Sequence, residues 1–426
     1  MKRKAIINAH VIDPVLGLDG VSNIYIKGKN IEHVGEQAPE KFTADITVDA
    51  NGLYAFPGIT DLAVYLREPG QERKGTIESE LEAAVSAGVT SVVCMPEPAC
   101  PIDNMPMVNL MRKRIKAEKK ARGIFIGAAT QELKGKKLTN MGGLKFAQCV
   151  GVSNQREPFQ DMRSLRLAIE YAATFNLPLY FHPIDPALSP EGGVHEGAIA
   201  TRMGLPAIPA AAEMTMIASI LALLEELQTP VHLCRISAAS SVDLIRRAKG
   251  RGLPVTADVA AHQLFLTDMD ISDYNPLCHV QPPLRGERDK EALRAGLVDG
   301  TIDAICSDHQ PHDIDAKLAP FQQTEPGISG IETLLPLTMR LVEEGVLTRL
   351  QAIQLLSTNP ANITNRSRGS LKKGSSADIV LYDPNETWEV DVEQLSSKGK
   401  NTPFQGWSFT GQVEKTYVKG KQVFNR

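Results

Sequence analysis

The sequence lacks the features that mark membrane and nucleic-acid-binding proteins. Its 426 residues contain no charge-free apolar stretch of about 18 residues, which argues against a membrane span. A net charge of −4 and a pI near 6.2 give no electrostatic reason to expect nucleic acid or an anionic membrane as partner. The basic run at 112–122 also contains Ile115 and Ala121, so we interpret it as the solvated face of a helix. The positive start Met1–Lys4 leads into a short strand-like segment, and we expect a cytoplasmic protein without a signal peptide.

Paired cysteines are also missing. The chain has six cysteines, and none belongs to a Cys-x-x-Cys pair. Some lie within apolar runs, as Cys94 does directly after Val92 and Val93. This usage predicts reduced, buried thiols and argues against disulfides and against a cysteine zinc site. The six are Cys94, Cys100, Cys149, Cys234, Cys278 and Cys306.

Two familiar catalytic signatures are absent. Gly142-Gly143 is followed by Leu-Lys-Phe, without the Gly-Lys-Ser/Thr that a phosphate-binding loop requires. Ser237, Ser240 and Ser241 have no plausible histidine and acid partners in the sequence, which makes a serine hydrolase an unsuitable interpretation.

The middle of the chain alternates between strand-like and helix-like segments. Helices are predicted between several of the strands, for example at 76–87, 211–227 and 241–250. Eight strands that alternate with helices predict an α/β fold of the (β/α)₈ TIM-barrel type, with an open doubly wound sheet as the second possibility. The predicted strands lie at 59–66, 90–95, 123–128, 149–152, 177–181, 230–234, 254–257 and 302–306.

The two ends of the chain have a different character from the middle. Residues 4–55 and 377–424 hold short β-rich runs separated by turn residues, and two helices are predicted before the second of these regions. We expect the ends to pair in one small β-domain beside the barrel, and residues 316–326 to form a surface loop. The predicted domains are a β-domain from 1–55 with 366–426 and a barrel from 56–365.

A series of short motifs gives the chain a family resemblance. The first is Arg67-Glu-Pro-Gly70, which follows the apolar run of the first predicted barrel strand. The motifs, taken in order, resemble the dihydroorotases of the amidohydrolase superfamily almost from end to end. The others are Pro101-Ile-Asp-Asn104, Gly204-Leu-Pro-Ala-Ile-Pro209, Pro282-Pro-Leu-Arg285, Asp308-His-Gln-Pro-His312, Gly327-Ile-Ser-Gly-Ile-Glu-Thr333 and Ser357-Thr-Asn-Pro360.

The resemblance implies a zinc site at the strand ends, and most of its ligands are replaced. The family's two histidines of the first strand correspond to Ala63 and Tyr65. Its bridging aspartate of the fourth strand corresponds to Asn154, and its histidine of the sixth strand to Arg235. Only His182 and Asp308 keep the family's residue type, and two ligands do not make a catalytic zinc site. We therefore expect no metal, no cofactor and no catalytic residues, with Arg235 balancing Asp308.

Substrate recognition is altered as well. The family is expected to hold the dihydroorotate carboxylate with an arginine, here Arg67, and with an asparagine that is here Glu97. A carboxylate at that position either repels an anionic ligand or takes Arg67 into an internal ion pair. The family's asparagine before Pro-Pro-Leu-Arg is Gln281 in this chain.

The remaining histidines have ordinary interpretations beside the functional ones. His232 and His262 follow apolar strands, so buried and hydrogen-bonded side chains are the simplest expectation. His309 and His312 are capable of binding a metal, although the family does not use them as its main zinc ligands.

Three functions follow from these residues and from the resemblance. The first is a non-catalytic pseudo-dihydroorotase, which the resemblance implies is a structural or assembly subunit for the catalytic chain of aspartate carbamoyltransferase in pyrimidine biosynthesis, with homo-oligomers inside a larger complex. The second is an amidohydrolase with a rebuilt metal site of His182, Asp308 and either His309 or His262. The third is a small-molecule binder that uses Arg67 in the old pocket.

Overall fold

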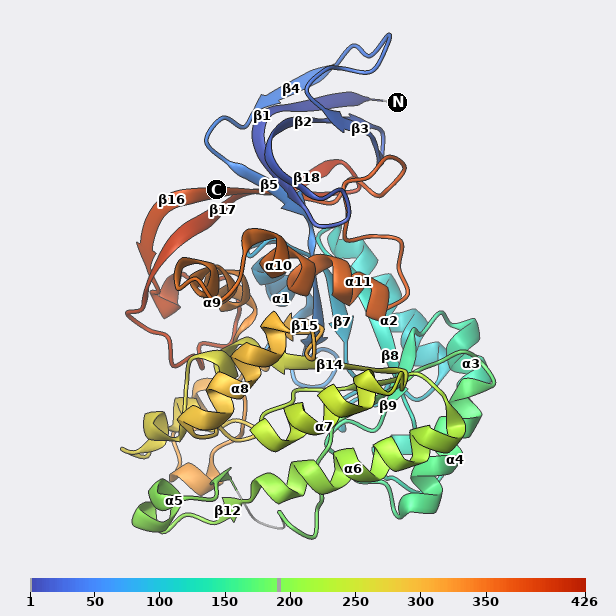
Figure 1. Cartoon of the computed structure of the whole chain (residues 1–426), viewed down its shortest axis with the longest axis vertical. Coiled ribbons are helices and arrows are strands. Elements are labelled where there is room, and N and C mark those ends of the chain that lie inside the picture. The colour runs from blue at the N-terminus through green and yellow to red at the C-terminus, as the bar shows by residue number, and fades with distance from the viewer. Residues whose placement is uncertain (1, 190–192) are drawn as a thin grey trace.

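The computed structural model describes residues 2–189 and 193–426. It has two parts: a barrel of strands and helices, and a β-domain that lies at the top of Figure 1. The colours of Figure 1 show that the β-domain combines the blue N-terminal and red C-terminal ends of the chain. The predicted pairing of the two ends is therefore confirmed.

Eight parallel strands form the barrel, in the order in which they occur along the chain. The circle closes just past the ends of the last and first strands, where Tyr65 N donates to His309 O (3.0 Å) and His309 N donates to Ala63 O (3.0 Å). The prediction of a (β/α)₈ barrel is confirmed, and each predicted strand segment overlaps an observed strand. The strands are β6 (Ile59–Val64), β7 (Val89–Cys94), β8 (Arg122–Ala128), β9 (Gly151–Ser153), β10 (Leu179–Phe181), β13 (Val231–Leu233), β14 (Val255–Ala260) and β15 (Ala304–Cys306).

The burial of these strands explains why they read as continuous apolar runs. Every residue of β6 and β7 is buried, because one face of each strand lines the barrel interior and the other packs against helices. Asp61 is the charged residue within β6, and its carboxylate accepts hydrogen bonds from the backbone N–H and the hydroxyl of Ser307. This contact joins the first and last strands across the closure.

The helices begin and end where capping residues allow. Thr76 and Ser79 form a capping box at the start of α1, and Asn104 caps α2 through its side chain. The second of the two helices predicted before the C-terminal strands was expected to end at Leu356, but helical structure continues to Ile363, with Pro360 in the first turn of the last helix, where no N–H is needed. The helices are α1 (Ile77–Ser86), α2 (Met105–Glu118), α3 (Met141–Phe146), α4 (Met162–Ala173), α5 (Ala198–Met203), α6 (Ala210–Leu227), α7 (Ala239–Gly250), α8 (Glu287–Val298), α9 (Ile331–Glu343), α10 (Arg349–Ile353) and α11 (Asn359–Ile363).

The β-domain is a single sheet in the order β18-β17-β16-β5-β1-β2-β3, with β4 paired to β1. The two chain ends meet where β5 and β16 run antiparallel, with Phe56 opposite Val380. β5 pairs in this sheet up to Pro57 and β6 begins at Ile59, so the residue at which one domain ends stays a prediction. The strands are β1 (Arg3–Asp13), β2 (Leu18–Lys27), β3 (Asn30–Gly35), β4 (Ile46–Asp49), β5 (Tyr54–Pro57), β16 (Ile379–Glu389), β17 (Ser408–Val418) and β18 (Lys421–Asn425).

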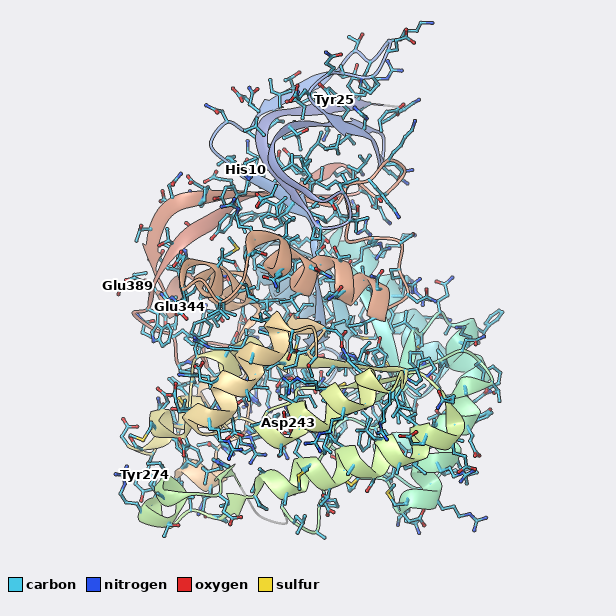
Figure 2. The ribbon with its side chains drawn as sticks, in the orientation of Figure 1. His10, Tyr25, Asp243, Tyr274, Glu344 and Glu389 are labelled. Atoms are coloured by element: carbon cyan, nitrogen blue, oxygen red, sulfur yellow. The ribbon has the colours of Figure 1, made fainter. Side chains whose placement is uncertain are left out.

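Polar contacts tie the β-domain to the barrel. Figure 2 shows His10 and Tyr25 on the β-domain, far from Asp243 on α7. His10 contacts Asp19 on the neighbouring strand, and Asp19 also pairs with Arg349 of α10 at 3.1 Å. The hairpin of β1 and β2 is thereby connected to the helices that cover the barrel.

The predicted surface loop at 316–326 is only partly at the surface. Leu318 is exposed, but Lys317 and Phe321 are buried within two short 3₁₀ turns. The Lys317 ammonium donates to the carbonyls of His279 and Glu325, which is how a lysine is accommodated there. The surface-loop prediction therefore holds for Leu318, Gln322, Gln323 and Glu325 and is wrong for Lys317 and Phe321, because the local sequence does not show which side chains of a loop fold inward.

The cysteines agree with their sequence interpretation. All six are free thiols, and five of them are buried, with Cys100 half-buried. Burial raises the pKa of the Cys149 thiol to about 12. In the parts of the chain that the structure describes, no helix has the length and apolar character needed to cross a membrane.

Candidate degenerate active site

The side chains singled out from the sequence come from the carboxyl ends of several barrel strands. Tyr65 follows β6, His182 follows β10, Arg235 follows β13 and Asp308 follows β15. Barrel enzymes carry their chemistry at this end of the strands. The fold therefore brings residues that are far apart in sequence together at the carboxyl-terminal end of the barrel, which is called the mouth below.

The backbone at the mouth has an unusual conformation. Arg67, Gln155, Arg235 and Asp308 all have positive φ, between 46° and 62°, which L-residues seldom adopt. Such residues cluster at functional sites, where the surrounding structure holds them in place. Each turns the chain at a strand end and sets the direction of a charged or amide side chain.

Arg235 and Arg156 both contact Asp308. Arg235 is 1% exposed, and its Nε lies 3.6 Å from Asp308 Oδ1. Arg156 Nη2 donates to the other carboxylate oxygen at 3.1 Å, and Gln310 Nε2 donates to the same oxygen at 2.8 Å. Two guanidinium groups therefore surround Asp308, the one carboxylate of the family's ligand set that this chain retains. The expected contact of Arg235 with Asp308, which balances the carboxylate charge, is observed.

Gln155 joins the first strand to this arginine pair. Its Oε1 accepts from Tyr65 Oη at 2.8 Å and from Arg235 Nη2 at 3.1 Å. Burial raises the pKa of the Tyr65 phenol, so Tyr65 is a neutral hydrogen-bond donor at pH 7. Tyr65 therefore contributes a structural hydrogen bond and no anionic metal ligand.

Asn154 is directed elsewhere. Its amide nitrogen donates to the carbonyls of Leu133 and Glu157, and its oxygen accepts from Thr130. The side chain thus fastens two loops and has no polar atom left for the mouth. Ala63 is buried in β6, and its carbonyl accepts the closing hydrogen bond from His309.

His182 stands at the edge of a small cavity of about 150 Å³, lined also by Gln155, Arg156, Phe181 and Met216. Both of its ring nitrogens are buried without a hydrogen-bond partner among the described residues. Burial, together with the nearby Arg235 and Arg156, lowers the pKa of His182 well below the usual value for histidine. His182 is therefore a neutral imidazole in an electropositive environment.

Arg67 is taken into an internal ion pair. Its Nη1 lies 2.8 Å from Glu97 Oε2, its Nε donates to the Pro311 carbonyl at 3.0 Å, and its guanidinium stacks over the Tyr65 ring at 5.3 Å. One of the two outcomes expected for Glu97, the consumption of Arg67, is thus what the structure shows. Gln281 is half-buried, and its backbone carbonyl accepts from Arg156.

The other histidines are largely used in packing. His232 contacts Thr256 Oγ1 at 2.8 Å and Asp258 Oδ2 at 2.9 Å, which confirms the simple interpretation of this residue. His309 Nδ1 accepts from the backbone N–H groups of Gly330 and Ile331, and its Nε2 lies 2.7 Å from Glu80. Both ring nitrogens of His309 are therefore occupied.

His262 is buried as expected, and burial lowers its pKa to about 4. Within the described residues it makes no side-chain hydrogen bond, so the second half of that expectation is wrong. A neutral imidazole costs less to bury than a charged one, which explains the direction of the pKa change although Asp308 and Arg156 lie nearby.

The donor atoms at the mouth do not fit zinc. In the described part of the chain one group brings three possible metal ligands together, namely His232, Cys234 and Asp258. Both nitrogens of His232 are already bonded, and Asp258 also accepts from the backbone N–H of Arg235. At the mouth itself the retained carboxylate is paired with arginines, whose fixed positive charge opposes a cation.

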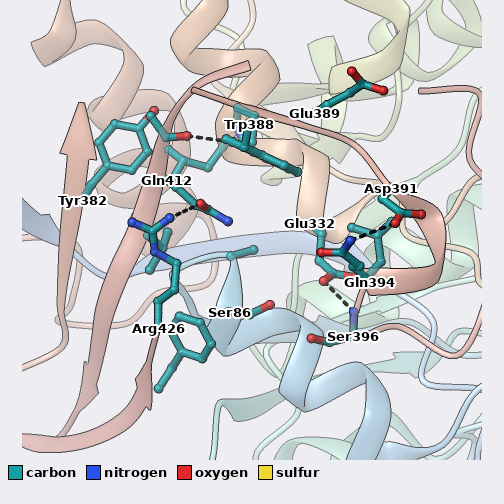
Figure 3. Close-up of a pocket in the computed structure, with 17 residues that line it drawn as sticks. Ser86, Glu332, Tyr382, Trp388, Glu389, Asp391, Gln394, Ser396, Gln412 and Arg426 are labelled. Atoms are coloured by element: carbon teal, nitrogen blue, oxygen red, sulfur yellow. Dashed lines mark hydrogen bonds between the residues drawn. The ribbon is translucent and has the colours of Figure 1, made fainter. Parts of the chain in front are cut away.

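A larger hollow of about 280 Å³ lies away from the mouth, between α1, α9 and the strands β16 and β17 (Figure 3). Its polar groups are mostly satisfied by one another. Trp388 Nε1 donates to the Gly411 carbonyl, Gln394 donates to Asp391, and Glu332 accepts from the backbone of Ser396. This hollow therefore lies between the two domains, and these polar groups are already hydrogen-bonded.

Comparison with known proteins agrees with this architecture. The profile of the amidohydrolase family matches residues 53–423. This chain belongs to the amidohydrolase family. It is 44% identical over 416 residues to a dihydroorotase-like protein of Pseudomonas putida, with 98% of each chain covered. It is 41% identical over 418 residues to a dihydroorotase of Geobacter metallireducens, again with 98% of each chain covered.

Solved structures of the family share the fold. The L-hydantoinase of Arthrobacter aurescens superimposes with a TM-score of 0.89 at 22% identity, covering 100% of this chain and 96% of the other. The dihydropyrimidinase of Brevibacillus agri gives a TM-score of 0.84 at 20% identity, covering 99% and 95%. At these sequence identities, the likeness shows that this chain shares the fold of the two enzymes.

Sequence reasoning missed two residues of this amidohydrolase's mouth, Gln155 and Arg156. It assigned the fourth-strand position to Asn154 from the family resemblance, whereas the structure directs Gln155 toward Arg235 and Arg156 toward Asp308. The run of polar residues after a short buried strand is the signal that was available. A regular alternation of faces does not continue through a residue with positive φ.

Proposed function

We propose that this amidohydrolase is a non-hydrolytic member of its family that serves as a structural subunit of an aspartate carbamoyltransferase complex in pyrimidine biosynthesis. The observation that carries the first half is the buried Arg235 guanidinium beside Asp308, at the position where the family's zinc ligand is expected. A buried cation there opposes a second cation and leaves no water-activating metal centre.

The side chains that would bind a substrate in this family also support the proposal. Arg67 is paired with Glu97 and bonded to the Pro311 carbonyl, so an incoming carboxylate has to compete with an existing carboxylate. His182 is neutral and lies beside two arginines. No group at the mouth, among those that the structure describes, combines an activated nucleophile with a polarising centre.

The choice of aspartate carbamoyltransferase as partner rests on the resemblance to dihydroorotases. In that family, the enzymes of successive steps of pyrimidine synthesis are often physically joined. The barrel and β-domain provide the contact surfaces, because the outer helices and strands are complete while the mouth is altered. A permanent interface of this kind buries more than about 2,000 Å² and is relatively apolar. We expect the amidohydrolase to enter the complex as a homo-oligomer.

The test is co-expression of the full chain with the aspartate carbamoyltransferase catalytic chain of the same organism. We expect one complex in size-exclusion chromatography with mass measurement, and carbamoyl aspartate formation that depends on its assembly. Asp308→Ala and His182→Ala should leave the complex intact, because both side chains lie at the mouth. Chains that elute separately at micromolar concentration, with transcarbamoylase activity unaffected, would refute the assembly role.

A second candidate function is an amidohydrolase with a rebuilt metal site. The observation in its favour is that both ring nitrogens of His182 and Oδ1 of Asp308 have no hydrogen-bond partner among the described residues. Metal analysis of protein purified without chelator separates the two candidates. Stoichiometric zinc that is lost in His182→Ala would favour the rebuilt site and contradict the non-hydrolytic proposal.

A further inference from the structure

A third recess lies at the opposite end of the barrel from the mouth, where β8 begins. It is a cleft of about 500 Å³ between the end of α2, the start of β8, the segment after α11 and the β17–β18 hairpin. Ten of its lining residues are basic, and among the described residues that line it none is acidic. The ten, called the cationic cleft below, are Lys29, Arg112, Lys116, Lys119, Lys120, Arg122, Arg366, Arg368, Lys419 and Lys421.

Most of this charge is not neutralised by the protein. Arg122 forms a bidentate pair with Asp378, and Lys120 pairs with Glu82. The other eight have no carboxylate within ion-pair distance in the described part of the chain. The Nε atoms of Arg122 and Arg366 are buried there without a hydrogen-bond partner. The chain as a whole is acidic, with a net charge of −4, so this concentration of positive charge is local.

The basic groups also repel one another. Burial and the nearby Arg122 lower the pKa of Arg368 to about 10. The pKa of Lys419 is lowered by burial and by Arg122, Arg368 and Lys29. A pocket of like charges with lowered pKa values is stabilised when an anion enters it.

A helix end explains only part of the cluster. Lys116 and Lys119 lie at the C-terminal end of α2, where cations interact favourably with the helix dipole. Arg366, Arg368, Lys419 and Lys421 come from other elements, so a preference for cations in the last turn of α2 does not account for their presence. Their convergence on the same recess needs a different cause.

We propose that the cationic cleft binds a small polyanion that carries two or more linked phosphate groups. Its volume suits a compact ligand, since small-molecule sites usually measure about 300–1,000 Å³. Three of its half-buried arginines, Arg112, Arg366 and Arg368, carry guanidinium groups free of carboxylates, and guanidinium matches phosphate oxygens in a bidentate geometry. The site is separate from the mouth and independent of the proposed partner.

The test is calorimetric titration of the full chain with inorganic triphosphate, and with orthophosphate, at two salt concentrations. We expect one triphosphate per chain, weaker binding at the higher salt, and much weaker binding of orthophosphate. Lys116→Glu with Lys421→Glu should weaken triphosphate binding by about tenfold or more, because two attractive contacts become repulsive. Both side chains are exposed, so the fold should tolerate the change.

The matched control is Lys136→Glu with Lys137→Glu, two exposed lysines in the loop beyond the other end of β8. It should bind triphosphate as the wild type does. A second cleft variant, Lys29→Ala with Lys419→Ala, guards against misfolding of the first, and thermal unfolding reports on both. Wild-type protein that does not bind triphosphate at millimolar concentration, or cleft variants that bind normally, would overturn the proposal.

Two further ligands define what the cleft recognises. A nucleoside triphosphate that binds more tightly than inorganic triphosphate identifies a nucleotide as the ligand, and equal affinities identify the polyphosphate group alone. A poly-glutamate peptide that binds in the cleft while triphosphate does not would contradict the proposal and favour an acidic protein segment instead.

Discussion

Replacement of Arg235 by methionine tests how the mouth is held together. The guanidinium is 1% exposed and has two partners, Gln155 Oε1 at 3.1 Å and Asp308 Oδ1 at 3.6 Å. Removal of one partner of a buried ion pair costs about 3–5 kcal/mol. Asp308 keeps its contacts with Arg156 and Gln310, so we expect the lower end, a loss of about 3 kcal/mol in the free energy of unfolding.

A double-mutant cycle separates the ion pair from simple packing. Arg235→Met combined with Asp308→Asn removes both charges, and we expect a coupling energy of about 1–2 kcal/mol, as for residues in direct contact. Arg156→Met is the matched control. Its side chain is 17% exposed, so water compensates for part of the lost contact and the expected cost is about 1–2 kcal/mol.

Urea unfolding measures these differences. Both tryptophans, Trp388 and Trp407, lie in or beside the β16 and β17 strands, so their fluorescence reports on the β-domain. Far-ultraviolet circular dichroism reports mainly on the helices of the barrel. Coincident transitions of the two probes justify one free energy for the chain. An Arg235→Met variant as stable as the wild type, without coupling to Asp308→Asn, would show that Arg235 does not stabilise the mouth through its charge.

Three other perturbations follow from the site. Ala63→His with Tyr65→His should give no dihydroorotase turnover with zinc supplied, because the arginine charges remain; measurable turnover in a carbamoyl aspartate assay would contradict this. Glu97→Gln should free Arg67, so carbamoyl aspartate should raise the melting temperature of the variant more than that of the wild type. Acidification should destabilise the protein between about pH 6.5 and pH 4, by up to about 1.4 kcal/mol per pH unit for each buried histidine with a lowered pKa. The folded chain holds these histidines neutral, so the unfolded chain takes up protons first; a pH series of urea midpoints should show a smaller slope for His262→Gln.

The barrel was predictable because its signal is local and repeated. Each buried strand, such as β7, reads as a short apolar run bounded by turn residues, and Thr76 and Asn104 mark helix starts with their capping side chains. The buried 3₁₀ turns around Lys317 and Phe321 were not predictable in the same way. Their burial depends on His279 of another loop, whose carbonyl accepts from Lys317 and whose ring packs against Phe321, and no local pattern records that contact.

The candidate site was likewise predictable in part. The residues present at the strand ends are readable from the sequence, including the exchange of the family's ligands for Ala63, Tyr65 and Arg235. Which of these side chains meet depends on the fold, because positive φ at Gln155 turns Arg156 toward Asp308 while Asn154 is bonded to neighbouring loops. The fold also gathered basic residues of four separate segments into the cationic cleft, since electrostatic contacts depend on distance in space and not on separation along the chain.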